Sequence, residues 1–170
     1  MNTLILYSSK HGTTKRYAKE MADQLFPQGH VIQVESINHH QLNQFDTVVL
    51  GTPIYAGRPQ RDMSAFCQKF HDELLSKRLY LFATGLASGD LASRELQEAY
   101  PETLQQHAQE KIFLGGAVDY PSLNLLEKSV VSLMPKDDFH LANLKKVQQL
   151  SKFNKQLLKQ FTQSITPLIG

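Results

Sequence analysis

The sequence predicts an α/β protein built on a doubly wound parallel sheet, and three observations lead to this fold class. Short apolar runs without polar alternation are typical of strands buried on both faces, and such runs occupy residues 4–7, 48–50, 79–83 and 112–114. Between them, apolar residues recur at spacings of three and four, which indicates amphipathic helices. Strands and helices alternate along the chain, and this alternation predicts right-handed crossovers with helices on both faces of the sheet.

The five predicted strands differ in how they are covered. The four apolar runs are expected to be buried on both faces. Residues 31–35 alternate instead, with Ile32 and Val34 pointing to one side and Gln33 and Glu35 to the other. That alternation is typical of a strand with only one buried face. The sequence therefore predicts a five-stranded sheet in which residues 31–35 form an edge.

Apolar stripes predict the helices between the strands. They comprise Ala18, Met21, Ala22 and Leu25; Met63, Phe66, Cys67, Phe70 and Leu74; Leu96, Ala99, Tyr100 and Leu104; and Leu141, Leu144, Val147, Leu150, Leu157, Leu158 and Phe161 near the C-terminus. Stripes at this spacing are the core-facing sides of helices and imply no cofactor. Residues 36–45 are too short for a full helix, whereas residues 118–136 predict a short inserted amphipathic helix after the last strand.

Length and composition indicate one globular domain, residues 1–170. The 170 residues suit a single domain, and 41% apolar with 20% charged residues is ordinary for a globular protein. No apolar run reaches the roughly eighteen residues that span a membrane, and no signal peptide is predicted at the N-terminus. The single cysteine, Cys67, excludes an internal disulfide and a CxxC pair. We therefore expect a cytoplasmic protein in which Cys67 is a small buried side chain.

Several functional classes that use α/β sheets lack their required residues here. A response regulator needs an acidic phosphate acceptor at the end of the third strand, where this chain has Gly51 and Thr52. A low-molecular-weight phosphatase needs a cysteine in the first loop, but the only cysteine is Cys67. The seven histidines are scattered, so no metal site is predicted. A net charge of +2 without a basic and aromatic stripe gives no indication of nucleic-acid binding.

The first loop, residues 8–15, predicts an anion site. It joins the first strand to the first helix and offers four hydroxyl groups and a glycine at the helix N-terminus. Backbone N–H groups and hydroxyls in such a position bind phosphate. The glycine spacing differs from that of a P-loop and of the GxGxxG dinucleotide loop, so neither of those sites is predicted. The alternative is an ordinary helix cap without a ligand.

The segment 5–18 resembles the N-terminal signature of the flavodoxin family. Two apolar residues and an aromatic residue precede a hydroxyl, a small residue, a threonine and an alanine at the family's spacing, and Met21 stands where the family has an aliphatic residue. The resemblance implies a three-layer flavodoxin-like fold with strand order 2-1-3-4-5 and non-covalently bound FMN. It also implies that the FMN phosphate is held by Ser9, by His11 through its backbone, and by Gly12, Thr13 and Thr14.

In flavodoxin-like proteins two further loops hold the flavin ring. Here residues 51–59 would pack on the ring, with Tyr55 as the stacking side chain and Gly57 allowing a close turn; the alternative is that Tyr55 is an exposed loop residue. The small residues of 84–90 would approach the other side. The candidate cofactor-binding residues are Ser9, Lys10, His11, Gly12, Thr13, Thr14, Pro53, Ile54, Tyr55, Ala56, Gly57, Thr84, Gly85 and Leu86. No catalytic side chain is predicted.

Residues 114–121, followed by the inserted helix, are similar to the flavodoxin-like menaquinone-dependent protoporphyrinogen oxidases. Gly51, Ile54 and Gly57 also match that family. The resemblance implies an FMN oxidoreductase of haem biosynthesis that oxidises a porphyrinogen and passes electrons to a quinone. The apolar stripe of the insert is expected either to cover the sheet edge or to contact the substrate or, peripherally, a membrane.

Two other functions stay open at this stage. One is a flavodoxin-type one-electron transfer protein whose partner is another redox protein, although such carriers are typically strongly acidic and this chain is not. The other is a flavin-free binding or regulatory module, because a fold does not fix a function. The oligomeric state is not predicted.

Overall fold

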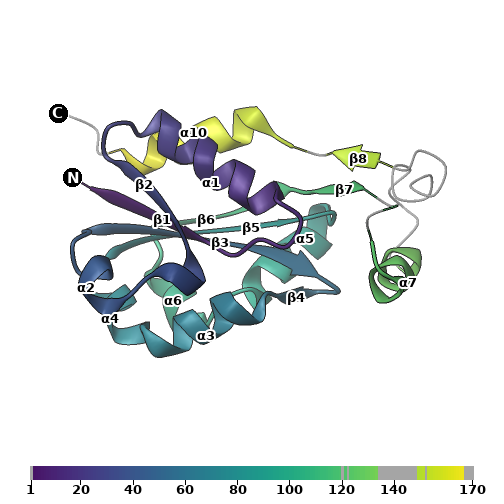
Figure 1. Cartoon of the computed structure of the whole chain (residues 1–170), viewed down its shortest axis with the longest axis horizontal. Helices are drawn as coiled ribbons and strands as arrows, with labels where there is room; N and C mark the ends of the chain where they lie inside the picture. Colours follow the sequence, from purple (N-terminus) through teal and green to yellow (C-terminus); the bar gives the residue numbers. More distant parts are fainter. Residues whose placement is uncertain (1, 120, 122, 134–148, 152, 167–170) are drawn as a thin grey trace.

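Five parallel strands form the central sheet of the computed structural model, which describes residues 2–119, 121, 123–133, 149–151 and 153–166 (Figure 1). They are β1 (Thr3–Tyr7), β2 (Gly29–Gln33), β3 (Thr47–Tyr55), β5 (Arg78–Gly85) and β6 (Glu110–Gly115). Their order is β2-β1-β3-β5-β6, with the short β4 (Arg58–Pro59) paired antiparallel to the end of β3. Leaving β4 aside, this is the predicted order 2-1-3-4-5, so the flavodoxin-like doubly wound fold is confirmed.

Helices cover both faces of the sheet and make three layers (Figure 1). On one face lie α1 (Thr13–Gln24) and α10 (Lys155–Ile165); on the other lie α3 (Arg61–Lys69), α4 (His71–Leu75), α5 (Gly89–Glu98) and α6 (Glu102–His107). The segment 36–45 contains a single helical turn, α2 (His39–Leu42), as its length predicts. Each face has a core of its own, and Cys67 is buried in the core beside α3, as predicted.

The apolar runs are buried on both faces because alternate residues enter different cores. In β1, Leu4 and Leu6 join the core beside α3, whereas Ile5 joins the core beneath α1 and α10. The strand β2 is an edge, as predicted, but it begins and ends two residues before the predicted bounds. Its Ile32 and Val31 pack against opposite cores, so the prediction of one buried face is wrong.

Two of the predicted helical stripes are divided in the structure. The stripe from Leu96 to Leu104 runs across α5 and α6, with Pro101 as the residue that caps α6. Proline has no backbone N–H and disfavours helical geometry in the residue before it, so a helix breaks there. The stripe from Met63 to Leu74 is likewise divided into α3 and α4 at Phe70.

Among the described residues of the C-terminal stripe, those in α10 are helical and Leu150 is not. Residues 141–148 lie outside the described residues. Leu150 lies in the strand β8 (Gln149–Ser151), which pairs antiparallel with β7 (Ala117–Asp119). A continuous helix over 141–161 is therefore wrong. The helix α10 buries Leu158 and Phe161 on the sheet.

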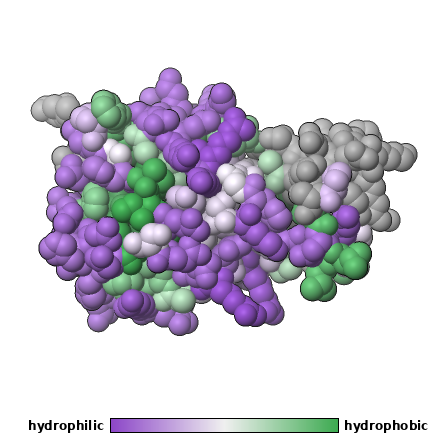
Figure 2. All heavy atoms as spheres, viewed as in Figure 1, coloured by the Kyte–Doolittle hydropathy of each residue, from purple (hydrophilic) through white to green (hydrophobic). Residues whose placement is uncertain are grey.

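The inserted helix is present as α7 (Leu125–Leu133), and residues 134–136 of the predicted insert lie outside the described residues. It lies at one end of the molecule, beyond the ends of β3 and β4 (Figure 1). Its residues Leu125, Leu126 and Leu133 are 83%, 79% and 84% exposed and contribute to the apolar patch seen there in Figure 2. Among the helices the structure describes, none is long and apolar enough to cross a membrane.

Candidate functional site

A cavity of about 290 Å³ opens where the parallel strands end at their carboxyl side. In open α/β sheets ligands bind at this edge, near the point where the strand order reverses. Its lining includes many of the predicted site residues, namely Lys10, Thr13, Pro53, Ile54, Tyr55, Ala56, Thr84, Gly85 and Leu86. The other predicted residues, Ser9, His11, Gly12, Thr14 and Gly57, are not among its lining residues.

The first loop ends in a helix start that can receive an anion. Gly12 has a φ of +90°, a left-handed conformation that favours glycine, and its N–H donates to Oγ of Ser9 over 3.0 Å. No side chain of the described residues caps α1, which begins at Thr13. The N–H groups of a first helical turn have no partner within the helix, so they can donate to a phosphate here.

Buried hydroxyl pairs fix the first loop to the sheet. Oγ of Ser8 donates to Oγ1 of Thr52 over 3.1 Å, and Oγ1 of Thr14 lies 2.9 Å from Oγ1 of Thr84. All four side chains are buried. The Thr14 hydroxyl therefore holds α1 against the end of β5, whereas its predicted contact with phosphate stays a prediction.

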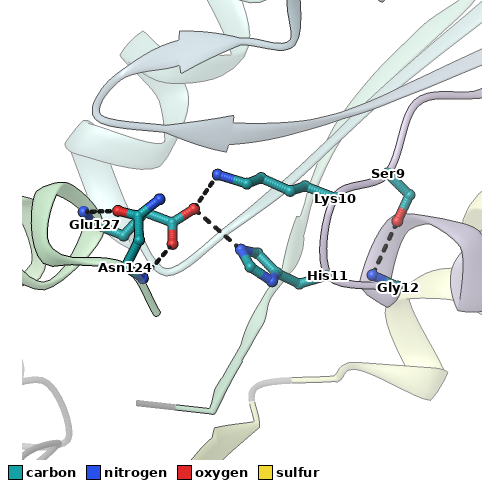
Figure 3. A network of polar contacts seen from close by, with 6 residues as sticks. All are labelled: Ser9, Lys10, His11, Gly12, Asn124 and Glu127. Atoms are coloured by element: carbon teal, nitrogen blue, oxygen red, sulfur yellow. Dashed lines mark hydrogen bonds and ion pairs between the residues drawn. The ribbon is translucent and has the colours of Figure 1, made fainter. Parts of the chain in front are cut away.

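The two cations of the first loop meet a carboxylate from α7 (Figure 3). Lys10 Nζ forms an ion pair with Oε1 of Glu127, and Nε2 of His11 lies 3.2 Å from the same oxygen. The other oxygen, Oε2, accepts from the backbone N–H of Asn124 over 2.9 Å, while Oδ1 of Asn124 accepts from the N–H of Glu127. This reciprocal pair is a capping box at the start of α7. Burial works to raise the pKa of Glu127, but hydrogen bonds from Lys10, the Asn124 backbone and His11 lower it to about 2.

The second predicted loop is the tip of a hairpin. The strand β3 continues to Tyr55 and returns as β4 after Ala56 and Gly57, whose φ angles are 52° and 70°. Two successive residues with positive φ are typical of the tight turn that matches the twist of a hairpin. The turn holds the half-buried Tyr55 ring at the cavity, edge-on to His11 at 5.5 Å. Burial, and after it the charge of Glu127, raise the pKa of Tyr55 to about 12.

The floor of the cavity is made by backbone in close approach. A Cβ atom on Gly116 would lie 2.8 Å from the carbonyl carbon of Gly85, so only glycine fits at this contact. Beside it stands Glu95 from α5, which is 7% exposed. Burial, and after it the charge of Glu98, raise the pKa of Glu95 to about 7.

Sequence reasoning missed part of the lining: Glu95, Gly116, Ala117, Leu123, Asn124, Leu126 and Glu127. Glu95 did leave a signal, because it is an acidic residue in the apolar stripe formed by Ala92, Leu96 and Ala99. Nothing in the sequence shows that α7 folds back over the first loop, since Glu127 and Lys10 are 117 residues apart. Among the described residues, no group of three or more His, Cys, Asp or Glu side chains could hold a metal ion.

The sheet order and a cavity between the start of α1 and the ends of β3 and β5 define the class of flavodoxin-like α/β proteins. A sequence model described as flavodoxin domain matches residues 4–140, and the chain belongs to this family. It is 26% identical over 149 residues to protoporphyrinogen IX dehydrogenase [quinone] of Escherichia coli (strain K12), an alignment that covers 80% of each chain.

Solved structures show the same fold at low identity. The two-electron reduced flavodoxin of Megasphaera elsdenii has a TM-score of 0.51 and 20% identity, covering 65% of this chain and 82% of that one. The WrbA-like flavodoxin protein of Agrobacterium tumefaciens has a TM-score of 0.54 and 16% identity, covering 86% of this chain and 98% of that one. These similarities confirm the fold.

Proposed function

We propose that this protein is a flavodoxin-type FMN oxidoreductase, with the flavin ring in the cavity and the phosphate at the start of α1. Membership of the flavodoxin domain family supports FMN as the cofactor. The observation that carries the proposal is that an uncapped helix start and an apolar cavity meet at the carboxyl edge of the sheet. A helix N-terminus suits the phosphate, and a mostly apolar cavity suits a flat aromatic ring.

The residues present fit this ligand. The first-turn N–H groups of α1, with Ser9 and Thr13, would bind the phosphate, and Tyr55 would contact the ring from the hairpin tip. The contact between Gly85 and Gly116 leaves that part of the floor without side chains, so a ring can lie close to the backbone there. When bound, FMN supplies the redox chemistry, while the protein binds it, orients it and keeps water from one side.

We infer further that the substrate is a porphyrinogen and that a quinone accepts the electrons. The relative from Escherichia coli carries protoporphyrinogen IX and a quinone in its name, and its alignment covers 80% of each chain. Both molecules are large and mainly apolar. In this protein Leu123 and Leu126 of the α7 region line the cavity next to the predicted ring site, which supports a small-molecule substrate of that kind.

Turnover of protoporphyrinogen IX tests this finer proposal. FMN-loaded protein is mixed anaerobically with protoporphyrinogen IX and a soluble quinone, and the porphyrin product is followed by its fluorescence. We expect porphyrin to form in proportion to loaded protein and not with apoprotein. If loaded protein forms none, yet exchanges electrons with another redox protein, the function is electron carriage instead. The FMN proposal would survive that result.

A further inference from the structure

A carboxyl group at the floor of the cavity has no partner among the residues that the structure describes. Glu95 lies on α5, is 7% exposed and lines the cavity. No hydrogen bond or ion pair joins its side chain to another residue in the part of the chain that the structure describes. Burying a carboxyl group without a partner costs free energy, and groups kept in such a state in a cleft are candidates for function.

The backbone leaves this carboxyl group open toward the cavity. A Cβ atom on Gly85 would lie 2.9 Å from Cζ of Phe113, 3.6 Å from the carbonyl oxygen of Ile54 and 3.7 Å from Oε2 of Glu95. Because glycine has no side chain, nothing at position 85 covers those two oxygens. Both residues line the cavity together with Gly85. A ligand lying over Gly85 would therefore meet a fixed acceptor, the Ile54 carbonyl, and beside it a group that can donate when protonated.

The charged groups around Glu95 do not neutralise it. On its own helix, Glu98 opposes its ionisation, and burial does so more strongly. Across the cavity, Lys10 and Glu127 are paired with each other. Among the described elements, α5 has its most extensive contacts with β4, β5 and β6. Their titratable side chains are the exposed Arg58 on β4 and, near the amino ends of the other strands and away from the cavity, Arg78, Tyr80, Glu110 and Lys111.

We propose that Glu95 is a proton-linked binding residue of the ring pocket: protonated, it donates a hydrogen bond to an acceptor atom of the flavin ring, and its ionisation weakens binding of that ring. The inference rests on the proposed function, which supplies the flavin. Loss of the proton removes the donor and leaves an unpaired charge against the ligand. Binding of the ring should therefore be accompanied by uptake of a proton near neutral pH, by linkage.

Riboflavin is the probe that isolates this end of the site. FMN has a phosphate that titrates near pH 6, whereas riboflavin has none. For the natural chain we expect riboflavin to bind about tenfold more weakly at pH 8.5 than at pH 6, the change that one unit of linked pKa shift produces. Glu95→Gln keeps a hydrogen-bond donor of similar size but has no titrating group. The variant should therefore bind riboflavin as tightly as the natural chain does at pH 6, and its affinity should stay constant up to pH 8.5.

A control and a second measurement make the test specific. Glu98→Gln removes one negative charge from the same helix, and this charge raises the pKa of Glu95. The variant should still lose affinity for riboflavin as the pH rises, but the midpoint of that loss should move to lower pH. Calorimetry at about pH 7.5, in two buffers of different ionisation enthalpy, should show proton uptake with the natural chain and none with Glu95→Gln. Proton uptake measured on the natural chain tests the role of Glu95 even if the variant folds poorly.

The outcomes separate this inference from the proposal beneath it. Parallel pH profiles for the natural chain and Glu95→Gln, or binding without proton uptake, would overturn the role of Glu95 while FMN binding stands. Failure of both FMN and riboflavin to bind at any pH would overturn the proposed function, and this inference with it.

Discussion

Two carboxyl groups line the same cavity in opposite electrostatic settings. Glu127 receives hydrogen bonds from Lys10, His11 and its own helix start, and its pKa falls to about 2. Glu95 receives none from the described part of the chain, and burial, with the charge of Glu98 after it, raises its pKa to about 7. Environments that push the pKa values of neighbouring acids apart assign them different tasks. Near neutral pH Glu127 is an anion that holds the first loop, whereas Glu95 can gain or lose its proton.

The raised pKa of Glu95 predicts a pH dependence of stability without any ligand. From about pH 4.5 to pH 7 the unfolded chain gives up the proton first, so the free energy of unfolding decreases as the pH rises through this window. Above about pH 7 Glu95 is ionised in both the folded and the unfolded chain, so its destabilising effect no longer changes with pH. We expect Glu95→Gln to be about 2 kcal/mol more stable than the natural chain at pH 8, and nearly equal at pH 4.5. Urea unfolding at the two pH values measures this. If Glu95→Gln and the natural chain differ in their free energy of unfolding by the same amount at both pH values, this prediction is contradicted.

At the scale of elements, α7 is attached to the first loop by charge more than by apolar contact. Leu125, Leu126 and Leu133 are largely exposed, while Glu127 is held by the two cations of the loop. The carboxylate therefore occupies the two cationic side chains of the loop that precedes α1 (Figure 3). A phosphate placed at that helix start would compete with it for Lys10 and His11.

Glu127→Gln tests that competition. Glutamine also satisfies a capping box, so α7 should stay folded while the charge is lost. We expect FMN to bind about two- to fivefold more tightly at low ionic strength, consistent with the roughly 0.5–1 kcal/mol of a partly exposed ion pair. Riboflavin, which has no phosphate, should bind with unchanged affinity. An unchanged ratio of FMN to riboflavin affinity would show that Glu127 and the phosphate do not share these cations.

The elements that the sequence predicts well are those whose pattern is local. The continuous apolar runs were sufficient to predict the sheet, whereas the anion site at the hydroxyl-rich loop before α1 stays a prediction. Helix ends were less predictable, because the break at Pro101 does not interrupt the apolar stripe on either side of it. The β7–β8 pairing and the Glu127 ion pairs could not be predicted, since both join segments far apart in the sequence.

At the scale of the whole molecule, the fold brings separate segments to one sheet edge. The start of α1, the hairpin at the end of β3, the end of β5 and the α7 region all border the cavity. Each segment contributes one kind of contact: helix N–H groups, an aromatic ring, glycine backbone and an anion. This division fits a ligand with an anionic end and a flat ring. We therefore infer that the chain binds FMN at this edge.

Titration of the purified protein with FMN, followed by visible absorbance and flavin fluorescence, tests that claim most directly. The account predicts a saturable change of the flavin spectrum at micromolar FMN. It also predicts that riboflavin binds at least about tenfold more weakly, because it lacks the phosphate that the start of α1 would hold. An unchanged spectrum at micromolar FMN would contradict the account.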